Sequence, residues 1–147
     1  MTKDMDKHND NDLVLEVNTR FYKALGTRDL ELMGTVFVHD DRAGCMHPGW
    51  VMLKGWEEIR QSWENVFDPQ DQLEIKLHNL TVELEGDAAW VTCIQELIYI
   101  NREPVMMNVS VSTNIFEKNG SQWKMVIHQA SPMPISAQQE TEGNNLQ

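Results

Sequence analysis

Basic side chains are scarce in this chain of 147 residues. The sequence has 12 Lys and Arg against 23 Asp and Glu, which gives a formal net charge of -11. Proteins that bind nucleic acid through its phosphates need clustered Lys and Arg, and anionic membrane surfaces attract the same side chains. We therefore expect neither nucleic acid nor a membrane among the partners.

Long apolar runs and cysteines are also few. No stretch approaches the roughly 18 consecutive apolar residues of a membrane span, and no N-terminal apolar segment resembles a secretion signal. The two cysteines, Cys45 and Cys93, form no CxxC pair, which favours reduced thiols in a chain that is not secreted. The sequence therefore predicts a cytoplasmic protein. It also lacks a Gly-rich phosphate loop, so no cofactor is expected.

The two ends of the chain differ in composition from its middle. Residues 1–11 and 136–147 are polar, charged and aperiodic, so both are predicted to be disordered tails. No repeat or linker divides the stretch between them. Residues 12–135 are therefore predicted to form a single domain, which suits a chain of this length.

Three helices are predicted in the first half. Asp12 is placed to cap the first, in which apolar residues recur at helical spacing until Gly26. Asp29 is placed to cap a short second helix. Gly55 opens a third, whose apolar face is placed for burial. That face consists of Trp56, Ile59, Trp63 and Val66–Phe67.

After residue 72 the apolar period changes to two. Strands are predicted at 72–84, 88–100, 105–116 and 122–133. In the first, the apolar phase slips at His78–Asn79, which indicates a bulge. The third carries polar residues on one face: Asn108, Ser110, Ser112 and Asn114. Helices followed by strands predict an α+β domain, with three helices packed in the concave face of a strongly curved antiparallel or mixed sheet.

A stiff turn carries a titratable imidazole in the segment Cys45–Trp50 (CMHPGW). Pro48 restricts His47 to extended conformations, and Gly49 permits a sharp change of direction after it. His47 therefore has a defined direction, and an ordinary pKa of about 6.5 would let it move a proton near neutral pH. The alternative is that His47 only hydrogen-bonds a backbone group inside a rigid turn.

Several short motifs follow one another in a characteristic order. They are Arg20–Tyr22, Ala24–Leu25 with Asp29–Leu30, Cys45–Trp50, Gly55–Trp56 with Ile59 and Trp63, and Trp123–Val126 with His128 and Ser131–Pro132. In this order the chain resembles SnoaL-like members of the nuclear transport factor 2-like superfamily. The resemblance implies a cone-shaped, cystatin-like α+β barrel, a pocket for a small and largely apolar organic molecule, and a homodimer formed through the outer sheet face.

The resemblance also implies a role for His47. It stands where ketosteroid isomerases have their general base, an Asp that directly precedes a Pro, so His47 would be the acid or base of an isomerase, cyclase or dehydratase without cofactor. The alternative is a non-catalytic ligand-binding or assembly domain. The isomerase oxyanion hole aligns with Phe21 and Ser112, and Phe21 cannot donate a hydrogen bond, so ketosteroid isomerisation itself is not expected. Tyr22, about 100° further around the helix, would serve only in a register shifted by one.

Ligand-binding side chains are predicted on several elements. They are Tyr22, Trp50, Trp63, Ser112, Asn114 and His128. His128 would pair with His47, as the resemblance to scytalone dehydratase implies, only if a bulge or twist separates it from Lys124; strand parity otherwise makes it a partly exposed or interface residue. Trp50 is predicted as a pocket wall or lid, or else as a structural corner residue.

A metal site is not predicted. The imidazole and carboxylates of His39, Asp40 and Asp41 offer suitable ligand atoms, with His47 as a third ligand. They lie in a polar connection, however, and a dense acidic turn is more typical of a solvated loop.

Overall fold

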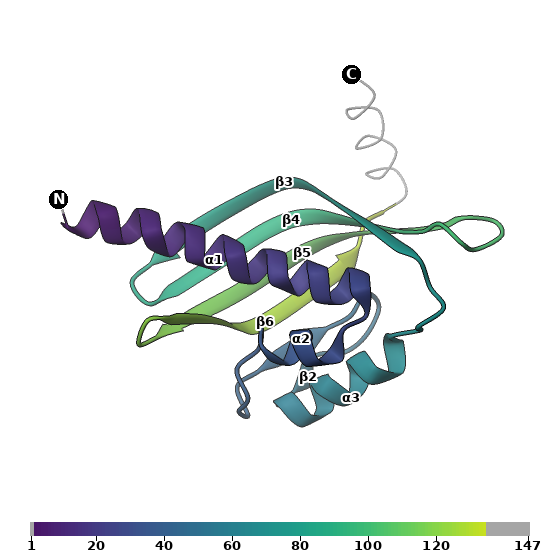
Figure 1. Cartoon of the computed structure of the whole chain (residues 1–147), viewed down its shortest axis with the longest axis horizontal. Coiled ribbons are helices and arrows are strands. Elements are labelled where there is room, and N and C mark those ends of the chain that lie inside the picture. The colour runs from purple at the N-terminus through teal and green to yellow at the C-terminus, as the bar shows by residue number, and fades with distance from the viewer. Residues whose placement is uncertain (1, 135–147) are drawn as a thin grey trace, which may run out of the picture.

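One long helix lies across the long strands of a sheet, and two shorter helices lie at one end of it (Figure 1). The computed structural model describes residues 2–134. The helices are α1 (Thr2–Thr27), α2 (Leu30–Gly34) and α3 (Trp56–Val66). The strands are β1 (Gly44–Met46), β2 (Leu53–Lys54), β3 (Leu73–Glu85), β4 (Ala88–Tyr99), β5 (Met106–Asn119) and β6 (Gln122–Pro132).

The sheet has six strands in the order β2-β1-β6-β5-β4-β3. β1 runs parallel to β6, and every other neighbouring pair is antiparallel. The predicted α+β class, with three helices packed against a mixed sheet, is therefore confirmed. The sheet is not closed into a barrel, since β2 and β3 are its two edges. The short strands β1 and β2 are not among the four predicted strands.

α1 begins well before the predicted start at Asp12. It is helical from Thr2, so the prediction of a disordered tail over 1–11 is wrong for residues 2–11. Asp10 gives a physical reason, because its carboxylate accepts hydrogen bonds from Trp123 Nε1 at 3.0 Å and from Lys118 Nζ at 3.2 Å. These contacts tie the first turns of the helix to the β5–β6 hairpin. The predicted tail at 136–147 lies outside the described residues.

The two short helices begin where the sequence predicts. The Asp29 side chain accepts a hydrogen bond from Leu32 N at 3.0 Å and caps α2. Gly55 precedes α3 with a φ of 88°, a conformation that suits glycine. The buried residues of α3 are Ile59, Ser62 and Trp63. This helix thus presents one polar side chain to the interior together with its apolar face.

The long strands confirm the predicted bulge and reveal a polar inner face. The β3–β4 register shifts between His78 and Thr81, and Asn79 has a φ of 54°. On β5, Ser112 and Asn114 are fully buried, whereas Val111, which directly precedes Ser112, is 47% exposed. The face that lies under α1 therefore carries small polar groups, and the apolar alternate residues point outward.

Candidate functional site

His47 and His128, far apart in the sequence, lie beside the same tryptophan. β1 pairs in parallel with β6 so that Cys45 lies opposite His128, and His47 follows directly after this strand. The ring centroid of Trp63, on α3, lies 4.4 Å from that of His47 and 6.2 Å from that of His128. Parallel pairing of a three-residue strand with the last strand thus brings the two imidazoles together.

A bulge in β6 turns His128 inward. Ile127 pairs with Ile115 and Met125 pairs with Phe116, so Val126 is an extra residue on this strand. The alternation reverses there, and His128 is only 2% exposed. The prediction of a partly exposed or interface histidine is therefore wrong, and the bulge that an inward-facing His128 required is present. The pairing of His128 with His47 stays a prediction.

His47 is buried between aromatic rings and bonded to a serine. Its Nε2 lies 2.8 Å from Ser62 Oγ, and its ring packs edge-on against Trp63. Trp50 covers the ring from outside at a centroid distance of 4.7 Å and is itself 45% exposed. Burial lowers the pKa of His47 to about 4, so the imidazole is neutral at pH 7. Its partner is a side chain rather than the backbone group of the alternative interpretation.

His128 ends a chain of buried amides. Its Nδ1 lies 2.6 Å from Asn114 Oδ1, and Asn114 Nδ2 donates to Asn18 Oδ1 at 2.8 Å. Burial, and secondarily the nearby His47, lower the pKa of His128 to about 3. Asn18 was missed by sequence reasoning. Its place in the apolar stripe of α1, one residue after Val17, could have indicated a buried amide.

A second buried polar cluster surrounds Tyr22. Its hydroxyl group donates to Gln95 Oε1 at 2.9 Å and lies 3.0 Å from Ser112 Oγ and 3.6 Å from Cys93 Sγ. Burial raises the pKa of Tyr22, so the phenol keeps its proton. Tyr22, rather than Phe21, lies beside Ser112, as a register shifted by one residue requires. Phe21 instead packs on His128 with ring centroids 4.5 Å apart.

Sequence reasoning also missed Gln95 and Cys93 as members of the Tyr22 cluster. Both lie on the side of β4 that faces the protein interior, and both are at most 3% exposed. A glutamine among the apolar residues of a central strand is a usable signal, because a buried amide requires partners. Cys93 gave no such signal, since a buried cysteine is ordinarily a small apolar residue.

A buried hydrogen-bond donor belongs to Trp63, whose ring lies beside the rings of His47 and His128. The residue is 1% exposed, and its Nε1 has no hydrogen-bond partner among the described residues. A buried donor without a partner costs about 1–3 kcal/mol. A ligand oxygen or a water molecule bound at this nitrogen would remove that cost.

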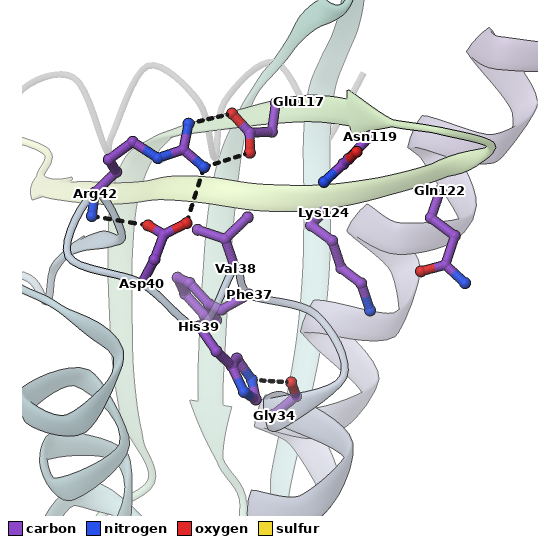
Figure 2. A pocket seen from close by; sticks show the side chains of 10 residues that line it. All are labelled: Gly34, Phe37, Val38, His39, Asp40, Arg42, Glu117, Asn119, Gln122 and Lys124. Atoms are coloured by element: carbon purple, nitrogen blue, oxygen red, sulfur yellow. Dashed lines mark hydrogen bonds and ion pairs between the residues drawn. The ribbon is translucent and has the colours of Figure 1, made fainter.

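Four hollows lie at the surface of the described residues, and neither His47 nor His128 lines any of these four. One, of about 350 Å³, lies between the α2–β1 connection and the β5–β6 hairpin (Figure 2). There Arg42 binds both carboxylate oxygens of Glu117 at 2.6 and 2.7 Å and Asp40 at 2.9 Å. The hydrogen bond from Arg42 lowers the pKa of Asp40. An enclosed pocket at His47 therefore stays a prediction.

The acidic connection shows no metal geometry. His39 Nε2 lies 2.6 Å from Gly34 O, and its ring stacks on Trp56 (Figure 2 shows the first contact). Among the described residues, no group of three or more His, Cys, Asp or Glu is arranged to hold a metal ion. Within residues 2–134, no helix is both long and apolar enough to cross a membrane.

Comparison with known proteins identifies the family. The model of the SnoaL-like domain matches residues 14–136. The chain belongs to the SnoaL-like family. Its solved structural neighbours are proteins of the nuclear transport factor 2-like superfamily, as the resemblance implied.

Three proteins that are similar to this SnoaL-like chain have names that describe different functions. The F-box protein SKIP8 of Arabidopsis thaliana is 29% identical over 126 residues, which are 86% of this chain and 52% of the relative, so the chain spans about half of that protein. A dehydratase candidate of the NTF2-like family from Streptomyces avermitilis is 27% identical with a TM-score of 0.79, covering 87% of this chain and 99% of its own. A candidate calcium/calmodulin-dependent protein kinase type II association domain from Thiobacillus denitrificans is 26% identical with a TM-score of 0.70, covering 80% and 93%.

Proposed function

We propose that this SnoaL-like chain binds a small, largely apolar organic molecule and transfers protons on it without a cofactor, in the manner of an isomerase, cyclase or dehydratase. The observation that carries the proposal is the group of two neutral imidazoles, His47 and His128, beside the ring of Trp63, whose N–H group has no hydrogen-bond partner among the described residues. A dehydratase candidate among the similar structures supports the same class of chemistry.

The proposed roles follow from the chemistry of the three rings. A neutral imidazole offers one nitrogen as a proton acceptor, so His47 would accept a proton from the bound molecule and return it elsewhere. The Trp63 N–H would donate to a ligand oxygen on which negative charge develops. His128, held by Asn114, would be the second proton carrier. Around them the interior is apolar, which strengthens each of these interactions.

The polar groups around Tyr22 would bind the other end of the molecule. Tyr22 and Ser112 offer hydroxyl groups that stay neutral, and Gln95 offers an amide. Trp50, half exposed over His47, would act as the lid. In this proposal the ligand enters beside Trp50, since that ring separates His47 from solvent.

A ligand screen compared between variants tests the proposal. The wild-type protein and His47→Ala are screened by thermal shift against a library of apolar carbonyl and hydroxyl compounds, and hits are verified by native mass spectrometry. We expect at least one compound to raise the melting temperature of the wild type and to lose this effect in His47→Ala. His39→Ala is the matched control, because it removes an exposed histidine whose ring lies on Trp56.

Retention of the same thermal shift in His47→Ala would remove His47 from the site. A library in which no compound binds the wild type would contradict the ligand-binding proposal as a whole.

An assembly domain is the second candidate function, and the outer sheet face favours it. This face exposes several large apolar side chains that a monomer would leave in water: Trp90, Met107 and Val111, which are 38%, 44% and 47% exposed. An association domain among the similar structures supports the same reading. The two candidates are compatible, since the ligand site would lie on the inner face and the contact on the outer one.

A further inference from the structure

Ser62 is a buried polar residue of α3 whose hydroxyl group makes two close contacts. Its Oγ lies 2.6 Å from the backbone oxygen of Ile59 and 2.8 Å from His47 Nε2, and the residue is 4% exposed. The side chain also borders an open surface hollow beside Trp50 and Leu53. Ser62 therefore lies between the imidazole of His47 and this hollow.

The two contacts determine which atom donates in each hydrogen bond. A carbonyl oxygen carries no proton, so its approach to Ser62 Oγ at 2.6 Å requires the serine proton between the two oxygens. A hydroxyl group has one proton only. Ser62 Oγ must then accept, rather than donate, in the 2.8 Å contact with His47, and the hydrogen of that bond belongs to Nε2.

We propose that Ser62 is a positioning residue that holds His47 in the Nε2–H tautomer, so that Nδ1 is the nitrogen that accepts a proton or hydrogen bond from a bound molecule. The assignment of the tautomer stands on the contacts of Ser62 with His47 and Ile59. The role of Nδ1 toward a ligand rests on the proposed function.

The neighbours of the ring fit this assignment. Cys45 Sγ lies 3.9 Å from the same Nε2, a longer contact to a weaker hydrogen-bonding atom, so Ser62 is the dominant partner. The rings of Trp63 and Trp50 lie against the imidazole at centroid distances of 4.4 and 4.7 Å and restrict its rotation. A neutral imidazole whose ring cannot turn has its tautomer fixed by the partner of one nitrogen.

The tautomer is measured directly by two-bond ¹H–¹⁵N correlation NMR on the uniformly labelled protein at pH 7. We expect Nε2 of His47 to show the chemical shift of a protonated ring nitrogen and Nδ1 that of a bare one, with the signals assigned by their loss in His47→Gln. In Ser62→Ala we expect both shifts to move toward the averages of a tautomer mixture. Ser62→Thr keeps a hydroxyl group and should keep the wild-type pattern, and the signals of His39 should not move in any variant.

An Nδ1–H tautomer of His47 in the wild type overturns the proposal, as does an unchanged pattern in Ser62→Ala. If Ser62→Ala does not fold, the wild-type spectrum alone decides. The NMR test needs no ligand, so its outcome is independent of the outcome of the ligand screen. If the wild type has the expected tautomer but binds no compound, the assignment to Ser62 is supported and the proposed function is contradicted. If the wild type binds a ligand but carries Nδ1–H at His47, the proposed function is supported and the assignment to Ser62 is contradicted.

Discussion

The hydroxyl oxygens of Tyr22, on α1, and Ser112, on β5, lie 3.0 Å apart in the interior of the protein. The phenol proton of Tyr22 goes to Gln95 Oε1, so the hydroxyl of Ser112 is the donor in this contact. The packing of α1 on the sheet thus includes a polar contact with a defined direction. Such a network favours one register of helix on strand, because any other would leave its members unpaired.

Removal of the phenol hydroxyl should therefore destabilise the fold. In Tyr22→Phe, Gln95 Oε1 and the Ser112 hydroxyl lose a buried partner, which costs about 1–3 kcal/mol. The free energy of unfolding in urea measures this loss. A double-mutant cycle with Ser112→Ala should give a coupling of at least about 0.5 kcal/mol, since residues in one network are not additive. Additive losses would show that the two hydroxyl groups do not interact.

Much of the fold was predictable because local physics determines it. The cap at Asp29, the start of α3 after Gly55 and the bulge at His78–Asn79 each follow from a few neighbouring residues, and the structure has all three. The start of α1 was not predictable in this way. It depends on Asp10 reaching Trp123, a contact between residues distant in the sequence.

The site was less predictable than the fold for the same reason. Its candidates, including His47 and Tyr22, came from residue type and from the resemblance, and both are buried. The burial of His128 depends on a bulge at Val126 that no apolar phase slip announced. The partner of His47, Ser62, was missed because a serine on a helix gives no signal until the imidazole lies beside it.

The two buried histidines should make stability depend on pH. Their pKa values are about 4 and 3 in the folded protein, against about 6.5 in an unfolded chain. Below pH 6.5 the unfolded state therefore binds protons that the folded state does not, so stability is complete above this pH and falls as the pH decreases toward 4. At about 1.4 kcal/mol for each pKa unit, His47 alone accounts for about 3 kcal/mol.

Urea unfolding of the wild type and His47→Gln at pH 7.5 and 4.5 checks this dependence. We expect the variant to lose less stability than the wild type between the two conditions, because it has one proton-binding group fewer in the unfolded state. His39→Gln should behave like the wild type, since that histidine is exposed. Equal losses in the wild type and His47→Gln would contradict the assignment of this pH dependence to His47.

The outer sheet face provides the test of self-association. Val111 lies opposite Ile94 across the β4–β5 ladder, and Trp90 lies opposite Ile115. The Thr92–Thr113 pair stands between these two apolar pairs on the same face. Burying such a surface between two copies would supply the hydrophobic free energy that a dimer needs. The charge of the chain does not prevent this contact, because these three residue pairs carry no charged side chain.

A lysine at the centre of this face should therefore prevent the expected dimerisation. In Val111→Lys the ammonium group would have to leave water at the contact without a partner, which is costly. We expect the wild type to sediment as a dimer at micromolar concentration and Val111→Lys as a folded monomer with unchanged far-UV circular dichroism. Val51→Lys is the matched control, because Val51 is 77% exposed in the loop next to Trp50, away from the sheet face. A monomeric wild type, or dissociation by both lysines alike, would exclude the outer sheet face as the contact.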